Sequence, residues 1–353
     1  MPSYRTQRVV EILDERSGIQ RIGLDDDSRA YALTGLVGSV AVGDEVVVNT
    51  TAVDAGLGTG GWHVVHWNLA HRHLHLPGAG HIMKLRYTSL QADTGAAEEL
   101  GEDTSSSHEA APLPDLGGTP VLVGGLHSQV GVAAVVAKAL QPELRISYVM
   151  TDGAALPLAI SDLVHGLVAR GLLDGTITAG HAFGGDLEAV STPSALNLAV
   201  ERQRADLVIC AMGPGVVGTA SPLGTTAVEV ASIAAAAQAL GARPFVMCRA
   251  SSGDSRERHR GISHHTLTAL RLSPLDVEVV LPPELSGEAA RIRPHRVHIV
   301  EPPDVGALLR AVDLRVTTMG RGPEEDPLFF RAVAAAVAHV VAVLRGSGTV
   351  GGS

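Results

Sequence analysis

Short apolar runs alternate with helical stretches from residue 119 onward, and this alternation constrains the fold more than any other feature of the sequence. The runs are Pro120–Val123, Arg145–Met150, Thr176–Ala179, Leu207–Cys210, Pro244–Cys248, Val277–Leu281, Val297–Val300 and Leu314–Thr317. Strands that alternate with helices form parallel βαβ units. The chain is therefore predicted to be an α/β protein with a mostly parallel sheet and helices on both faces.

The region before this alternation has a different pattern. It contains short strand-like runs separated by turn residues: Gln7–Leu13, Ile19–Leu24, Arg29–Leu33, Glu45–Asn49 and Trp62–Trp67. Five short strands within about 70 residues are typical of a small barrel. We therefore expect a small N-terminal β-barrel-like domain over residues 1–91.

An acidic segment separates the two patterns. Residues 92–115 carry seven Asp or Glu and no Lys or Arg, which leaves −3 of the net charge of −10 for the rest of the chain. Residues 92–118 show no apolar periodicity and are predicted to be a flexible acidic linker. The α/β domain is then expected over 119–345, followed by a flexible tail over 346–353.

Composition disfavours several classes of protein. Aromatic residues make up only 3% of the chain, which argues against a nucleic-acid-binding surface built on base stacking. The apolar run Leu328–Leu344 is interrupted by Arg331 and His339, so a packing helix is favoured over a membrane span. The N-terminal residues lack the apolar core of a signal peptide, and two isolated cysteines suit a reducing compartment. We expect a cytoplasmic protein; the sequence leaves open whether it forms a homo-oligomer.

Five glycine-rich or polar loops follow the predicted strands. Ligands of parallel sheets bind beyond the carboxyl ends of the strands, where helix N-termini present free N–H groups. The loop from Gly213 to Thr226 combines glycines, hydroxyls and a helix start, and it lacks the ending of a Walker A loop. It is predicted to bind an anion, with a purely structural turn as the alternative, and its candidate substrate-binding residues are Gly213, Gly215, Gly218 and Thr219.

The segment Ser251–Thr266 is the most informative loop. Its arginines Arg256, Arg258 and Arg260 alternate with other residues, and guanidinium groups bind phosphate or carboxylate in bidentate fashion. His264 and His265 open a predicted helix, whose N-terminal dipole favours neutral imidazoles able to bind metal or act as bases. A solvated charged loop is the alternative interpretation.

Other loops could complete a catalytic or metal site. We take His264, His265 and Asp152 as candidate catalytic residues, and His127, His181, Asp186 and His264 as candidate metal ligands. Imidazole and carboxylate ligands suit a divalent metal, but their spacing matches no metal-binding signature, and loop histidines with ordinary hydrogen bonds are the commoner case. The cofactor therefore stays unknown, with a divalent metal as one alternative.

Five segments of this chain together resemble one protein family. They are NTTAVDAGLGTGG (49–61), HIMKLRYTSLQ (81–91), GGLHSQ (124–129), GPGVVGTASPLGTT (213–226) and RERHRGISHHT (256–266). In these segments the sequence resembles the uncharacterised bacterial domain-of-unknown-function family 3866. The resemblance implies a bacterial cytoplasmic protein of this two-part layout, and it implies no activity and no catalytic residues.

The residues support one leading hypothesis and one rival. The leading hypothesis is binding of a small anionic molecule at the C-terminal edge of the α/β sheet, by a metal-assisted hydrolase or transferase. The rival is a non-catalytic ligand-sensing or protein-interaction module. No nucleic acid or membrane is expected as a partner, and the sequence leaves open whether the protein is an enzyme.

Overall fold

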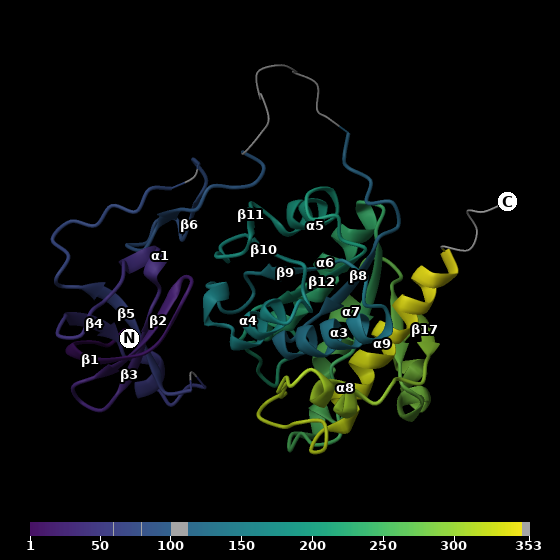
Figure 1. Cartoon of the computed structure of the whole chain (residues 1–353). Coiled ribbons are helices and arrows are strands. Elements are labelled where there is room, and N and C mark those ends of the chain that lie inside the picture. The colour runs from purple at the N-terminus through teal and green to yellow at the C-terminus, as the bar shows by residue number, and fades with distance from the viewer. Residues whose placement is uncertain (59, 79, 100–111, 348–353) are drawn as a thin grey trace. The chain divides into compact units, whose positions relative to one another are not determined.

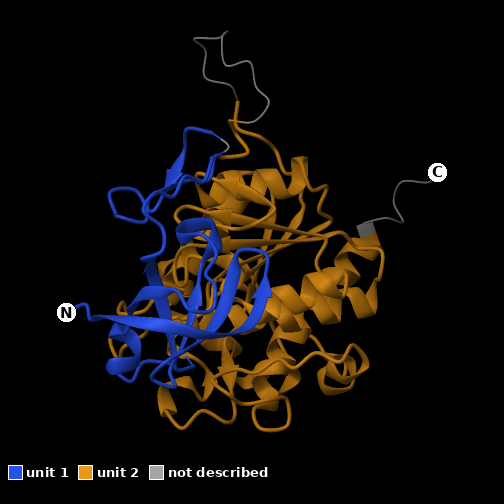
Figure 2. Cartoon of the chain, turned by 60° about the vertical axis from the view of Figure 1, so that its left-hand side comes forward, with its two compact units in different colours: residues 1–95 blue, residues 96–353 orange. Residues whose placement is uncertain are grey.

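The chain divides into two compact units, residues 1–95 and 96–353 (Figure 2). The computed structural model describes residues 1–58, 60–78, 80–99 and 112–347. Residues 100–111 of the predicted linker and 348–353 of the predicted tail lie outside the described residues.

The first unit contains a closed five-stranded barrel, in the order β1-β2-β3-β5-β4. Its elements are β1 (Tyr4–Arg16), β2 (Ile19–Leu24), β3 (Arg29–Ala32), α1 (Thr34–Val37), β4 (Glu45–Asn49), α2 (Thr51–Asp54) and β5 (Trp62–Asn68). A short pair, β6 (Met83–Lys84) and β7 (Ala92–Asp93), follows. The barrel core consists of small and branched side chains such as Val46, Val48 and Ile22. They come from alternate positions of the strands, because every second side chain of a barrel strand points inward. The predicted N-terminal barrel is confirmed.

The second unit contains an eight-stranded sheet in which every neighbouring pair is parallel (Figure 1). The order across the sheet is β11-β10-β9-β12-β8-β13-β16-β17. The strands are β8 (Pro120–Gly124), β9 (Ile146–Thr151), β10 (Gly175–Ala179), β11 (Leu187–Ala189), β12 (Leu207–Met212), β13 (Arg243–Met247), β16 (Glu278–Leu281) and β17 (Arg296–Ile299).

Helices cover both faces of this sheet, as predicted. They are α3 (His127–Leu140), α4 (Asp162–Ala169), α5 (Thr192–Glu201), α6 (Glu229–Ala239), α7 (His264–Leu272), α8 (Val305–Ala311) and α9 (Pro327–Ser347). The 3₁₀ turns are η1 (Leu158–Ile160), η2 (Thr226–Val228), η3 (Glu257–His259) and η4 (Pro283–Ile292), and a small ribbon joins β14 (Ala250–Ser251) to β15 (Gly261–Ile262).

The sheet alternates its side chains between two cores. Leu122 of β8 packs with α3, α4, α8 and α9, whereas its neighbours Val121 and Val123 pack with α5, α6 and α7. This period of two on a strand buried on both faces explains the nearly continuous apolar runs in the sequence. Helix α9 is long and apolar enough to cross a membrane, but more than half of it is buried, and its residues join the first of these cores.

One predicted strand is wrong. Leu314–Thr317 forms no strand, and the only pairing nearby is an isolated bridge between Thr318 and Arg321. Val316 is instead buried against α3, where Gly131 leaves room for it. An apolar run of four residues does not distinguish a strand from a packed loop.

Candidate functional site

The strand order places a topological switch at the carboxyl edge of the sheet. β8 and β12 are neighbours, but the chain leaves β8 toward β9 through α3 and leaves β12 toward β13 through α6, on the opposite face. Loops that diverge in this way open the usual ligand crevice of parallel sheets. The loops after β9 and β12 contact each other at the same edge, because the Ala155 amide donates to the Pro214 carbonyl at 3.0 Å.

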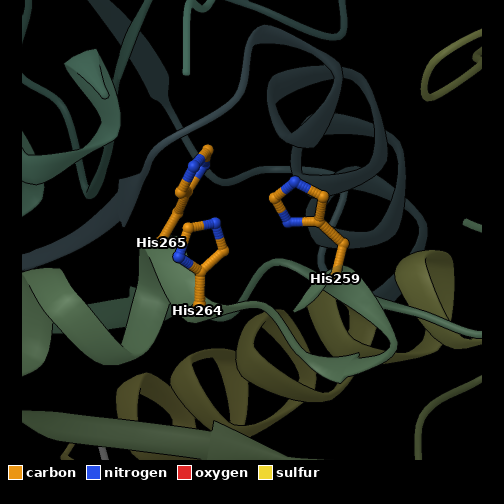
Figure 3. A group of neighbouring side chains, drawn as sticks. All are labelled: His259, His264 and His265. Carbon is orange, nitrogen blue, oxygen red and sulfur yellow. The ribbon is translucent and has the colours of Figure 1, made fainter. Parts of the chain in front are cut away.

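Three histidines gather in the loop and helix start that follow β13 at this edge of the sheet (Figure 3). His259 ends the turn η3, and His264 and His265 open α7. One nitrogen from each ring lies within 4.8 Å of the others, and the ring centroids are 4.3–5.1 Å apart. We call this group the histidine triad.

The hydrogen bonds of the triad leave one nitrogen on each ring available. His259 Nδ1 lies 2.7 Å from Ser263 Oγ, and His265 Nδ1 lies 3.3 Å from Thr225 Oγ1. The Nε2 atoms of His259, His264 and His265 are all buried and have no hydrogen-bond partner among the described residues. A proton on Nδ1 of His259 and His265 satisfies these hydroxyl contacts and leaves both Nε2 lone pairs free. Arg249 Nη1, at 3.4 Å from His265 Nδ1, is the one contact that opposes this tautomer.

Electrostatics keep the triad neutral. Burial, followed by the Arg249 charge, lowers the pKa of His259 to about 3. Burial and then the neighbouring His264 lower the pKa of His265 to about 4, while burial and Arg258 lower that of His264. Neutral imidazole is the form that binds a metal ion.

A charged network supports the loop that carries the triad. Asp254 accepts two hydrogen bonds of 2.9 Å from the Arg256 guanidinium, and it lies 3.6 Å from Arg249 and 3.5 Å from Arg321. Asp326 pairs with Arg321 at 3.0 Å. Three guanidinium groups therefore face two carboxylates, so this network carries a net positive charge that favours an anion nearby.

The three predicted substrate arginines have different roles. Arg256 is occupied by Asp254, and the Arg260 side chain donates to the Asp254 carbonyl at 3.0 Å. Arg258 makes no hydrogen bond to another described residue, and it lines an open cavity of about 640 Å³ together with His264 and Arg260. Among these arginines, Arg258 is the one available to a ligand.

The glycine loop after β12 forms a wall of the triad. A Cβ at Gly218 would lie 2.4 Å from His265 Cε1, and one at Gly213 would lie 2.6 Å from the Ala155 carbonyl oxygen. Gly215 has a φ of +103°, where side chains are strained. The Thr219 hydroxyl donates to the Gly224 carbonyl within the loop. The fold thus places the Gly218 backbone against the His265 ring.

The other candidate ligands do not join the triad. Both His127 nitrogens are engaged, by the Tyr148 hydroxyl at 3.2 Å and the Ser161 hydroxyl at 2.7 Å. Asp152 accepts from the His181 backbone amide at 3.0 Å. Asp186 accepts from the amide and hydroxyl of Thr176, near the amino end of β10. Among the described residues, the structure therefore groups none of His127, His181 and Asp186 with His264 in a possible metal site.

Comparison with known proteins identifies the family. The family model described as "Protein of unknown function (DUF3866)" matches residues 29–337. The chain belongs to this family. No curated protein matches this DUF3866 chain. Among solved structures, chloroplast FtsY from Physcomitrella patens is similar with a TM-score of 0.28 and 11% identity over 65% of this chain. The match spans 66% of the FtsY chain, just under two thirds, and likeness at this level carries no functional inference.

The sequence of this DUF3866 protein did not single out two residues that the structure makes notable, His259 and Glu229. His259 completes the triad, and its position five residues before His264 in the same loop was the available signal. Glu229, in the first turn of α6, accepts from the Thr151 hydroxyl at 2.8 Å. Burial, with help from the Asp152 charge, raises the pKa of Glu229 to about 7 despite the Thr151 hydrogen bond. Its only sequence signal was a lone acid beginning an alanine-rich helix.

Proposed function

We propose that this DUF3866 protein is a metal-assisted enzyme that acts on a small anionic molecule at the carboxyl edge of its sheet. His259, His264 and His265 hold a divalent cation of the zinc type. The observation that carries the proposal is the set of three buried Nε2 atoms that have no hydrogen-bond partner in the part of the chain that the structure describes. Leaving a buried polar atom unpaired costs about 1–3 kcal/mol, so three in one place call for a common ligand.

The triad fits a zinc ion in ligand type and number. Three protein ligands and one open position are typical of catalytic zinc, and four tetrahedral ligands about 2.1 Å from the metal lie roughly 3.4 Å from each other. The triad nitrogens lie within 4.8 Å of one another, so binding requires the rings to move inward by about 1 Å. When bound, the ion would lower the pKa of a water molecule in the open position and so supply a nucleophile.

The residues around the triad suit an anionic substrate. The charged network around Asp254 described above carries excess positive charge. Arg258 lines the same cavity as His264. In the proposed reaction Arg258 binds and orients the anionic group of the substrate, and Gly218 and Thr225 hold the His265 ring in place.

Elemental analysis of the purified full-length chain tests the metal. We expect zinc or another first-row metal to bind after reloading, and H264A to bind one ion per chain fewer than wild type. H165A is the matched control, because His165 is exposed on α4 and outside the triad. Wild-type protein that binds no transition metal, and gains no thermal stability from one, refutes the proposal.

Phosphate and pyrophosphate binding test the anion site. We expect R258A to weaken binding by about 10–100-fold, since a hydrogen bond to a charged group contributes about 1.5–3 kcal/mol. R291A is the control, because Arg291 lines the same cavity but is paired with Glu288. Metal binding without turnover of any phosphorylated or carboxylated compound would favour the non-catalytic sensing module instead.

A further inference from the structure

A second group of possible metal ligands lies away from the triad, at the β17 edge of the sheet. It consists of Glu278 at the start of β16, His298 in β17 and His339 in α9. One ligand atom from each lies within 4.8 Å of the others. We propose that Glu278, His298 and His339 form a second zinc site, a structural clamp that ties the C-terminal helix to the edge strand.

The strand register explains why these side chains meet. Glu278 pairs with Arg296, so His298 lies two residues further along β17 and points to the same face. Val280, two residues after Glu278, packs in the core that contains α9. Both side chains therefore face α9, where His339 lies within an apolar stretch of the helix.

The geometry is close to that of a bound ion. His298 Nε2 lies 3.1 Å and His339 Nε2 lies 4.0 Å from the same oxygen, Glu278 Oε2. Ligands of a tetrahedral zinc ion lie roughly 3.4 Å apart, so His339 Nε2 must approach Glu278 Oε2 by about 0.6 Å. The two imidazole rings are stacked, with centroids 4.2 Å apart and an interplanar angle of 27°, so one ring must turn before both Nε2 lone pairs can point at a shared ion. At 4.0 Å, His339 is too far for a hydrogen bond to Glu278.

Arg243 prepares the carboxylate for this role. Its guanidinium donates to the other oxygen, Oε1, at 2.8 Å and lies over the Phe245 ring, which itself packs edge-on to His339. A hydrogen bond from a second residue commonly orients a ligating carboxylate. The positive charge of Arg243 opposes a cation, but this side chain is 44% exposed and is screened by solvent.

Zinc stoichiometry of the full-length chain tests the proposal. The protein is stripped with a chelator, reloaded with zinc sulfate, desalted and analysed for zinc per chain. We expect two zinc ions in wild type, one in H298Q and one in H339Q. H264Q removes only the triad ion, and the exposed-residue control H165Q keeps both. We also expect zinc to raise the melting temperature of H264Q but to raise that of H298Q/H264Q by less.

Each outcome decides between the two sites. If H298Q and H339Q both keep the wild-type zinc content, or H264Q removes all zinc, the clamp is refuted. If H264Q keeps both ions while H298Q loses one, the triad proposal fails and the clamp stands. Circular dichroism of the stripped variants checks folding; His298 is 34% exposed, so H298Q decides the question should H339Q fail to fold.

Discussion

Replacing Gly218 by alanine is the sharpest test of how the loop after β12 positions the triad. The new Cβ would lie 2.4 Å from His265 Cε1, 2.9 Å from its Nε2 and 3.3 Å from Thr225 Oγ1. Ordinary contacts between such atoms are about 3.5–4.0 Å, so the ring or the loop must move by about 1 Å. Such a shift changes the position of His265 Nε2, which must reach the same ion as the other two nitrogens of the triad. We therefore expect zinc binding to weaken by about 10–100-fold, as when supporting residues of metal sites are lost.

The assay is competition for zinc against a chromophoric chelator, with thermal unfolding in chelator as the measure of stability. Overpacking alone should destabilise the fold by about 1–3 kcal/mol. G287A is the matched control, because a Cβ at Gly287 meets nothing within 4 Å and this residue lies in the same unit. Wild-type zinc affinity in G218A would falsify the conclusion that Gly218 holds His265 in a ligating position.

Two further substitutions test buried acidic side chains of the second unit. Because the pKa of Glu229 is raised to about 7 from 4.5, the folded state holds a proton that the unfolded state releases, and stability falls as pH rises between these values. Urea unfolding measured from about pH 5 to 8 should show that the free energy of unfolding of wild type falls by about 3 kcal/mol, whereas that of E229Q does not. Equal pH profiles for the two proteins would contradict the raised pKa of Glu229. Asp326 is fully buried and accepts from Ser251, Ser252 and Arg321, so D326A should cost about 3–5 kcal/mol at neutral pH. Burial raises the pKa of Asp326, but these hydrogen bonds lower it overall. The stability that Asp326 contributes is therefore lost as the pH falls through its pKa in the folded state. A destabilisation by D326A that stays the same in acid would contradict this reasoning.

Local patterns in the sequence were sufficient for the architecture. The five barrel strands and seven of the eight strands of the parallel sheet follow from apolar runs and turn residues, whereas the short edge strand β11 was not predicted. The start of α7 at His264 follows from the Ser263 cap. These features depend on neighbours in the chain, because hydrophobic periodicity and capping act within a few residues. The sequence also predicted the carboxyl edge as the place of the candidate site, because the loops of any parallel sheet that bind ligands meet there.

The partners of each polar side chain were decided by the tertiary structure. The sequence offered Arg256 as a substrate ligand, but the fold places Asp254 against it and leaves Arg258 exposed to the cavity. It offered His127 as a metal ligand, but Tyr148 and Ser161 satisfy both of its nitrogens. Hydrogen-bond satisfaction depends on which groups meet in the interior, which the residue type alone does not contain.

The two groups of possible metal ligands also depend on both local sequence and long-range packing. The residues of the triad are close in sequence, but their alignment depends on Gly218, which lies 47 positions before His265 and reaches it only through the strand order. The Glu278–His298–His339 group joins two strands and a helix that no local pattern connects. The sequence determined which elements form, whereas long-range packing determined which side chains share a site, because strand order and helix docking are fixed by the burial of the whole core.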